Sequence, residues 1–214
     1  MVITIDGPAG SGKSTTAKLV AQKLGFKYLD TGATYRVVAL AVLKNNISPS
    51  NEKEVEKLVP ELNIRFVDTK ILLNDEDVSS QIRTEEIGKL ASLCSTYKGV
   101  RENMVKLQRK IAQNQSIVCE GRDMGTVVFP NAEIKIYMDA NVETRAKRRE
   151  KELSEKGTPE SFESIIESIK SRDKQDSTRK HSPLKIPDGA IVIDTTNLSI
   201  EEQVIKITEI VGSR

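Results

Sequence analysis

Short runs of apolar, mostly β-branched residues recur along the chain and alternate with segments whose apolar residues follow helical spacing. Unbroken runs of this kind are typical of strands buried on both faces of a sheet. They lie at 2–5, 26–29, 116–119, 134–138 and 190–193. Helical spacing follows over 17–24, 33–43, 142–151 and 200–211. This alternation predicts an α/β fold: a doubly wound, mostly parallel sheet of five strands with helices on both faces.

The period changes in the middle of the chain. Three short strand candidates, Ile64–Val67, Ile71–Leu73 and Val78–Ile82, are separated by the turn signals Asp68-Thr69 and Asn74-Asp75. They predict a small antiparallel meander, and helical spacing over 87–94 and 100–111 follows it. We interpret this region as an insertion into the α/β frame.

Composition narrows the classes of function. With 214 residues and 37% hydrophobic content, one main domain is expected. Lys+Arg 33 against Asp+Glu 31 leaves a formal charge of +2, which gives no case for nucleic-acid or anionic-membrane binding. No segment is apolar enough over ~20 residues to span a bilayer, and no signal peptide is evident, so a cytoplasmic location is expected. Cys94 and Cys119 lack metal-ligand or redox spacing and are interpreted as reduced, structural residues.

The first apolar run leads directly into a glycine-rich loop and then a helix. The loop matches G-x-x-x-x-G-K-[ST], the phosphate-binding loop or P-loop. Its backbone N–H groups and the helix start would bind phosphate oxygens, Lys13 would reach the outer phosphates, and Ser14 would ligate Mg²⁺. The alternative is a glycine turn with a chance Lys-Ser pair. The residues predicted to bind the nucleoside triphosphate are Gly7, Pro8, Ala9, Gly10, Ser11, Gly12, Lys13, Ser14 and Thr15.

Two further polar segments follow predicted strands. Asp30-Thr31-Gly32 comes after the second strand, and Glu120-Gly121-Arg122-Asp123 after the third. Because ligands of such sheets bind beyond the carboxyl ends of the strands, we expect both segments near the P-loop. Arg122 and Asp123 are therefore predicted site residues, with a structural ion pair as the alternative.

Two basic helical segments complete the set of candidates. Arg145, Arg148 and Arg149 share one face, as residues that screen charge during phosphoryl transfer would, although a solvated face paired with nearby glutamates is the alternative. Arg172, Asp176 and Arg179 align if their helix continues, and the alternative is an intrahelical ion-pair ladder.

Taken together, these residues resemble the bacterial cytidylate kinases, a family of P-loop nucleoside-monophosphate kinases. The matching motifs span nearly the whole chain: 3–8 leading into the P-loop, 29–36, 121–130, and 172–179 with Pro183-Leu184. The inserted β region also fits the enlarged monophosphate-binding lobe of this family. Two positions depart from the family pattern, Thr34 for an apolar residue and Met124 for a branched aliphatic one.

The resemblance implies transfer of the γ-phosphoryl group of ATP, with Mg²⁺, to CMP or dCMP. It implies that the acceptor phosphate is held by Thr31, Arg36, Arg122, Arg172 and Arg179; that cytosine is read by Ser92, Arg101 and Asp123; and that Asp176 contacts the ribose. Lys13 and arginines 122, 145, 148 and 149 would be catalytic. A monomer is expected. Within one P-loop kinase domain, 1–214, the expected parts are a core of 1–30, 114–148 and 176–214, a monophosphate-binding insertion of 31–113, and a lid of about 149–175.

The predicted mechanism needs no general base. The second pKa of a monophosphate is near ~6, so the attacking oxygen is already anionic and the catalysts are the groups that bring two anions together. Asp123 could read the base or support the metal, and Glu120 competes for the metal side. Two rival functions remain: a P-loop kinase for another small acceptor, and a nucleotide switch, which predicts an N-K-x-D motif that the sequence lacks.

Overall fold

The computed structural model describes residues 1–67, 70–155 and 157–213. The turn predicted at Asp68-Thr69 lies outside these ranges. The chain divides into two compact units, one formed by Met1–Leu29 with Ala112–Arg214 and one formed by Asp30–Ile111.

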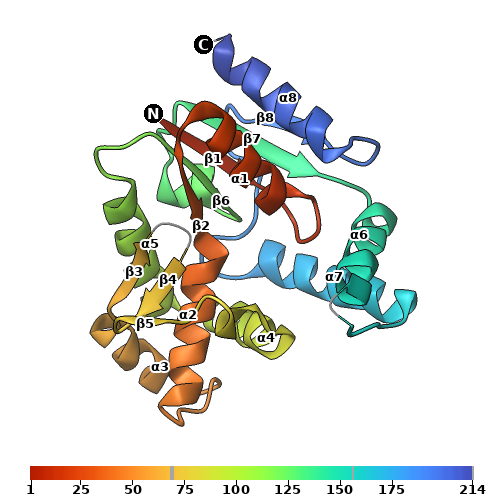
Figure 1. Cartoon of the computed structure of the whole chain (residues 1–214). Coiled ribbons are helices and arrows are strands. Elements are labelled where there is room, and N and C mark those ends of the chain that lie inside the picture. Colours follow the sequence, from red (N-terminus) through yellow and green to blue (C-terminus); the bar gives the residue numbers. More distant parts are fainter. Residues whose placement is uncertain (68–69, 156, 214) are drawn as a thin grey trace. The chain divides into compact units, whose positions relative to one another are not determined.

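The first unit is built on a five-stranded sheet with the order β2-β6-β1-β7-β8 (Figure 1). The strands are β1 (Val2–Asp6), β2 (Lys27–Asp30), β6 (Ile117–Gly121), β7 (Ile134–Asp139) and β8 (Ile191–Asp194). β1 pairs in parallel with both β6 and β7, and β7 pairs in parallel with β8. Asp6 therefore lies between Gly121 and Tyr137 at the carboxyl end of the central strand. The predicted fold class, a parallel α/β sheet with a separate small antiparallel sheet, is confirmed.

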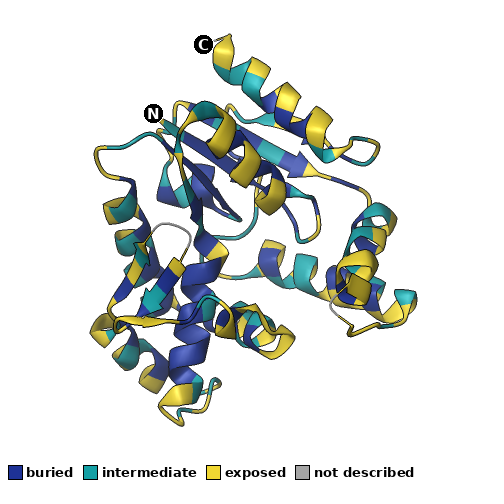
Figure 2. Ribbon diagram, in the orientation of Figure 1, coloured by how far each residue is buried: buried dark blue, intermediate teal, exposed yellow. Residues whose placement is uncertain are grey.

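Four helices belong to this unit, in the part of the chain described. α1 (Lys13–Leu24) and α8 (Ile200–Gly212) pack against each other, and so do α6 (Val142–Glu155) and α7 (Phe162–Thr178). Side chains of β1, α1, β7 and α8 form the main core of the unit, with Ile3, Ile5 and Ile136 fully buried. Figure 2 shows β1 and β6 as buried over most of their length, whereas β2 and β8 also carry intermediate and exposed residues.

The helix predicted over 142–151 is longer than its apolar spacing indicates, because α6 continues through Glu155. Leu153 is 4% exposed and packs in a small apolar cluster with Ile165 and Ile169 of α7. This contact holds the last turn of α6 in helical form, although the local sequence is almost wholly charged. Helix length here is set by tertiary packing.

The second unit surrounds a buried helix. α2 (Thr31–Lys44) contributes ten buried residues and is buried along most of its length in Figure 2. Around it lie α3 (Glu52–Leu58), α4 (Glu85–Cys94), α5 (Lys98–Ala112), and an antiparallel sheet of β3 (Ile64–Val67), β4 (Lys70–Leu73) and β5 (Glu76–Asp77). A short 3₁₀ helix, η1 (Val59–Glu61), follows α3 and contains Pro60.

The prediction that Val78–Ile82 forms the third strand of this unit is wrong. The strand is β5, two residues long, and a 3₁₀ helix, η2 (Gln81–Arg83), follows it. Val78 and Ile82 are both fully buried in the core of the unit, and the Ile82 N–H donates to the Val78 carbonyl at 3.1 Å. Two apolar residues four apart on the same side are a helical spacing, and the chain follows that spacing.

One element was not predicted from the sequence. After β6 and the pair Arg122-Asp123, residues Met124–Val128 form η3, a single turn of π-helix. Its defining hydrogen bonds run from the N–H of Val128 to the Asp123 carbonyl at 3.1 Å and from the N–H of Phe129 to the Met124 carbonyl at 2.6 Å. Among the described residues, no helix combines the length and hydropathy that crossing a membrane requires.

Candidate active site

The P-loop joins β1 to α1 as the motif predicts. Gly10 and Gly12 have φ values of 78° and 90°, in the region that favours glycine, and Gly12 is the N-cap of α1. No acidic residue lies in the first turn of α1. An anion at this helix start would meet the positive end of the helix dipole and backbone N–H groups, with no carboxylate of that turn opposing it.

Inside the loop, the Lys13 ammonium donates to the Pro8 carbonyl at 2.7 Å, and the Ser11 hydroxyl donates to the same carbonyl at 3.1 Å. Lys13 is 4% exposed. Burial and the neighbouring Arg122 charge lower its pKa to about 7. An arriving phosphate would act in the opposite direction, because an adjacent anion favours the charged ammonium.

Ser14, the predicted metal ligand, is close to a carboxylate from β6. Its hydroxyl donates to Glu120 Oε1 at 2.8 Å, and Glu120 is 4% exposed. The Tyr28 hydroxyl also donates to that oxygen, at 3.4 Å. A serine hydroxyl beside a carboxylate is an oxygen donor set that suits Mg²⁺, which is commonly held by one or two protein oxygens together with substrate phosphates.

The segment after β6 forms an ion-pair cluster with the end of α7. Arg122 Nε donates to Asp176 Oδ2 at 2.8 Å, and Arg179 pairs with Asp176 at 3.6 Å and with Asp123 at 3.8 Å. All four side chains are largely buried, with exposed fractions of 3% to 17%. The interpretation as a ladder within one helix accounts only for the Arg179–Asp176 pair, because the other two pairs join separate elements.

Charges of this cluster also act on Lys13 of the P-loop. Burial would lower the pKa of Arg122, but the charge of Asp176 outweighs it and raises that pKa. Burial would raise the pKa of Asp176, and the charges of Arg122, Arg172 and Arg179 outweigh it and lower that pKa. Arg122 and Arg172 both act on the pKa of Lys13, so the first unit gathers these cations and the P-loop lysine within electrostatic reach of one another.

The predicted catalytic arginines of α6 differ in their surroundings. Arg145 is buried: Nη1 donates to Asp173 Oδ2 at 2.6 Å and to the P-loop carbonyl of Ala9 at 3.2 Å. Arg148 donates to the carbonyl of Thr195 at 2.6 Å. Arg149 pairs with Glu152, three residues on, at 3.0 Å. The alternative of a solvated, glutamate-paired face therefore describes Arg149, whereas Arg145 joins the P-loop to α7.

In the second unit, Thr31 and Arg36 lie on the first turns of α2. Thr31 is 2% exposed, and its carbonyl accepts the Thr34 hydroxyl at 2.7 Å. The Gln108 amide of α5 donates to the same Thr34 hydroxyl at 3.0 Å. Arg36 Nη1 donates to the carbonyl of Ile82 at 3.1 Å. The departure from the family pattern at Thr34 thus belongs to a buried polar chain.

Ser92 and Arg101 are connected through Ser95. Arg101 is 3% exposed, donates to the Ser95 carbonyl at 3.1 Å, and places its guanidinium carbon 5.4 Å from the centre of the Tyr35 ring. The Ser95 hydroxyl donates to the Ser92 carbonyl at 2.8 Å. The two residues predicted to read cytosine in this unit are therefore held by one short hydrogen-bonded chain.

Three residues to which the sequence assigned no role hold η3, the P-loop and the start of α1 in place. The Asp6 carboxylate accepts the N–H groups of Met124 and Gly125, both at 2.7 Å. The Thr195 hydroxyl donates to the Ser11 carbonyl at 3.0 Å, and Gln203 of α8 accepts the Thr16 hydroxyl at 2.7 Å. A charged residue ending an apolar strand was a usable signal for Asp6. Nothing local distinguishes Thr195 or Gln203.

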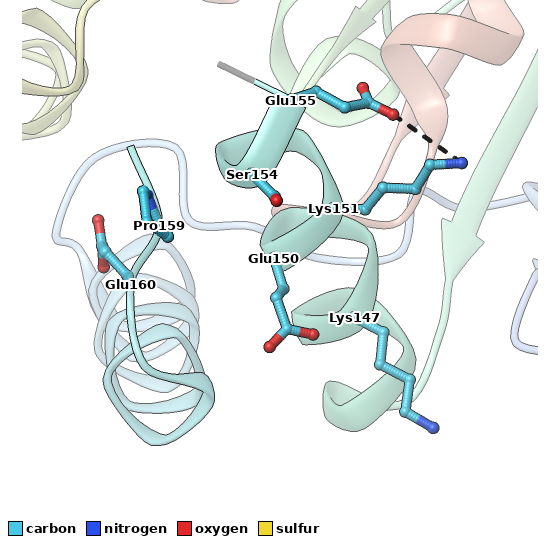
Figure 3. A pocket seen from close by; sticks show the side chains of 7 residues that line it. All are labelled: Lys147, Glu150, Lys151, Ser154, Glu155, Pro159 and Glu160. Atoms are coloured by element: carbon cyan, nitrogen blue, oxygen red, sulfur yellow. Dashed lines mark ion pairs between the residues drawn. The ribbon is translucent and has the colours of Figure 1, made fainter. Parts of the chain in front are cut away.

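A cavity of about 440 Å³ lies on α6 and the segment that follows it (Figure 3). It is lined by Lys147, Glu150, Lys151, Ser154, Glu155, Pro159 and Glu160, and Lys151 and Glu155 form an ion pair within it. Its lining carries both signs of charge and none of the predicted site residues. It is therefore not part of the candidate active site.

A parallel sheet with a P-loop and a buried cluster of arginines and carboxylates defines a P-loop kinase of small molecules. Two solved structures of shikimate kinases share this fold. That of Bacteroides thetaiotaomicron has a TM-score of 0.50 at 13% identity over 99% of this chain and 98% of that one. The shikimate kinase of Acinetobacter baumannii has a TM-score of 0.50 at 15% identity over 99% and 93%. At such identities these likenesses show the fold alone.

Sequence relatives define the family. The cytidylate kinase family model matches residues 3–213. The cytidylate kinase of Thermosipho melanesiensis is 53% identical over 99% of this chain and 97% of its own, and that of Fusobacterium nucleatum is 50% identical over 94% and 93%. The chain belongs to the cytidylate kinase family. The predictions of an ATP-dependent kinase and of this family are confirmed.

Proposed function

We propose that this cytidylate kinase performs phosphoryl transfer from ATP to CMP or dCMP with the P-loop as donor site and the Arg122–Asp123 segment as part of the acceptor site. The observation that carries this is the buried cluster of Arg122, Asp176, Arg179 and Asp123, of which Arg122 and Asp176 also act on the pKa of Lys13. Arginines at fixed positions bind phosphate oxygens in pairs, and buried carboxylates hold those arginines in place.

The acceptor phosphate is bound by Arg122, Arg172 and Arg179 in the first unit, and Thr31 and Arg36 of the second unit also contribute to acceptor binding. Ser92, Arg101 and Asp123 bind cytosine, and Asp176 contacts the ribose. Cytosine presents an amine donor beside two acceptors, so a carboxylate together with arginine and hydroxyl donors matches it, whereas uracil would turn a carbonyl toward the carboxylate. This difference would give selectivity for cytosine.

The dianionic acceptor needs no general base, and the residues of the chain act on charge and position. Lys13 holds the outer phosphates of ATP, and Arg145 and Arg148 screen the oxygens between which the phosphoryl group passes, whereas Arg149 belongs to the solvated face of α6. Arg145 also fixes the P-loop through the Ala9 carbonyl. We place the lid at about 149–175, outside the core of 1–30, 114–148 and 176–214 and the insertion of 31–113.

Mg²⁺ would be held by Ser14 with Glu120 in support, because these two side chains already contact each other at 2.8 Å. It would neutralise phosphate charge. Asp123 pairs at 3.8 Å with Arg179, which is a proposed acceptor residue. This pairing favours a role of Asp123 in binding the cytosine base, and it leaves Glu120 to support the metal ion. We further propose a monomer in the cytoplasm that acts on nucleotides and binds no nucleic acid, which size-exclusion chromatography with and without added RNA would test.

Turnover of CMP, dCMP, UMP, AMP and shikimate tests the acceptor, and two variants test the roles of the carboxylates. We expect Asp123→Asn to lower the ratio of CMP to UMP turnover by about a hundredfold, because its amide can donate to the uracil carbonyl. Glu120→Gln should raise the Mg²⁺ concentration needed for half-maximal activity while leaving KM for CMP within about twofold. Equal turnover of AMP or shikimate, or the two phenotypes exchanged, would overturn the proposal.

A further inference from the structure

The carboxylate of Asp6 takes the place of the missing N-terminal cap of η3. It is fully buried at the end of β1 and accepts two backbone hydrogen bonds at 2.7 Å, from the N–H groups of Met124 and Gly125. These are the first two residues of η3, and they follow directly after Arg122 and Asp123. The first N–H groups of any helix lack partners within it, so each needs an acceptor from elsewhere.

The residue that would ordinarily provide this acceptor is Asp123. It occupies the N-cap position of η3, yet its side chain makes no capping hydrogen bond. Instead its carboxylate pairs with Arg179, on the side of the acceptor cluster. The acceptor of the first N–H groups of η3 is therefore Asp6 at the end of β1, and not the adjacent Asp123. Asp6 lies 118 residues away from Met124 in the sequence.

We propose that Asp6 is a positioning residue for the acceptor nucleotide: it holds the backbone that carries Arg122 and Asp123, so that the Asp123 carboxylate serves Arg179 and the base instead of capping η3. This inference rests on the proposed role of Arg122 and Asp123 in binding CMP. Asp6 touches no substrate in this account and acts through the backbone of η3.

The geometry explains why a carboxylate is needed. Each oxygen of Asp6 accepts one N–H, and an asparagine amide could accept only one and would turn its own NH₂ toward the other. The close approach also depends on Gly125. A Cβ built on that glycine would lie 2.8 Å from Pro187 Cγ and 3.1 Å from the Thr4 hydroxyl, so any side chain would push η3 away from β1.

Asp6 also links η3 to the strand that leads into the P-loop. It is followed by Gly7, the first residue of the P-loop, and its neighbours across the sheet are Gly121 and Tyr137. One side chain therefore ties the segment bearing the acceptor residues to the strand that bears the donor loop. Rigid support of this kind is what holds binding groups in productive geometry.

The test compares Asp6→Asn with the matched control Thr4→Val. Thr4 is fully buried on the same strand beside Gly125, and among described residues its hydroxyl has no hydrogen-bond partner, so Thr4→Val changes the core without removing a bond to η3. For Asp6→Asn we expect KM for CMP to rise about tenfold with KM for ATP within about twofold, the effect of one lost hydrogen bond to a charged acceptor. Thr4→Val should leave both KM values unchanged.

A second readout needs no substrate. Hydrogen exchange of the backbone amides at 124–125, measured by mass spectrometry on the peptide covering 122–129, should be at least about tenfold faster in Asp6→Asn than in Thr4→Val. An unchanged exchange rate, an equal rise in both KM values, or a fall in kcat alone with both KM values intact would each overturn the proposal. The last outcome is what a purely structural role of Asp6 predicts.

If Asp6→Asn does not fold, Gly125→Ala strains the same contact from the other side, because its Cβ would meet Pro187 and Thr4. It should give the same selective rise in KM for CMP, and its absence would overturn the proposal. Failure of the proposed function looks different. If Arg122→Ala leaves CMP turnover unchanged, the acceptor assignment falls, whereas a strong effect of Arg122→Ala with none of Asp6→Asn removes only the role of Asp6.

Discussion

At the scale of single residues, burial shifts the pKa values of Asp6 and Lys13 in opposite directions. Burial raises the pKa of Asp6 to about 6, although two backbone N–H groups partly oppose it. Burial together with the Arg122 charge lowers the pKa of Lys13 to about 7. Both shifts disfavour the charged form, as expected when a charge leaves water. The ionised Asp6 that caps η3 at neutral pH therefore lowers stability relative to its protonated form.

This shift predicts how stability depends on pH. Between about 4 and about 6, the folded chain keeps the Asp6 proton that the unfolded chain has released, so the stability of the folded state falls as pH rises through that range. Asp6→Asn lacks this titration. From pH 5 to pH 7.5 we expect the wild-type protein to lose about 1.4 kcal/mol of unfolding free energy relative to Asp6→Asn.

Urea unfolding of both proteins at pH 5, 6 and 7.5 measures this difference directly. All other titrating groups are common to the two proteins, so they cancel in the comparison. Parallel pH curves for the two proteins would contradict the raised pKa of Asp6.

At the scale of elements, the P-loop is fixed by how closely backbone approaches backbone. Gly7 has a φ of 153°, and a Cβ built on it would lie 2.0 Å from the Met138 carbonyl oxygen of β7. Backbone cannot yield as the tip of a flexible side chain can. The turn out of β1 therefore admits glycine alone, for reasons of space as well as of dihedral angle.

Gly7→Ala should accordingly destabilise the protein by at least about 3 kcal/mol, well above the cost of a strained dihedral angle alone. The matched control is Gly189→Ala, because Gly189 also has a positive φ, 72°, but has no atom within 4 Å of its built Cβ. We expect it to cost roughly 1–2 kcal/mol, the strain of the left-handed region. Equal losses for the two variants in denaturant unfolding would mean that the Met138 contact is not the cause.

The elements that could be predicted from the sequence were those with a strong local period. The five strands, the P-loop between β1 and α1, and the helices α4 and α5 follow from apolar spacing and glycine placement. The strand predicted over 78–82 failed because two apolar residues four apart fit a turn as well as a strand. The π-helical turn η3 was out of reach, because its cap, Asp6, lies more than a hundred residues earlier.

At the scale of the whole molecule, the candidate site residues divide between two compact units. The P-loop and the Arg122 cluster belong to the first, and Thr31, Arg36, Ser92 and Arg101 to the second. The motifs identified the residue types, but the pairings that fix them, such as Arg145 with Asp173, depend on packing between distant helices. Their partners could therefore not be chosen from the sequence.

Ligand-induced stabilisation separates the two halves of the site. At a hundred times its Kd, CMP should stabilise the wild-type protein by about 2.7 kcal/mol, a rise in Tm of roughly 5–10 °C. Arg122→Ala should lose most of this shift and keep the shift given by a non-hydrolysable ATP analogue, because the P-loop remains intact. Arg65→Ala, at an exposed ion pair of β3, serves as the control and should keep both shifts. Loss of both shifts in Arg122→Ala would indicate disruption of the whole first unit.

The mutual pairing of Arg122, Asp176, Arg179 and Asp123 also limits how this protein can vary over evolutionary time. Losing one arginine alone removes a counter-charge from a buried carboxylate, which is costly even where no substrate is bound. We therefore expect loss of charge at any one of the four positions to lower the stability of the fold, in addition to its effect on the proposed acceptor site. Replacing the whole cluster by another arrangement of charges would require several of these positions to change together, through intermediates that are less stable.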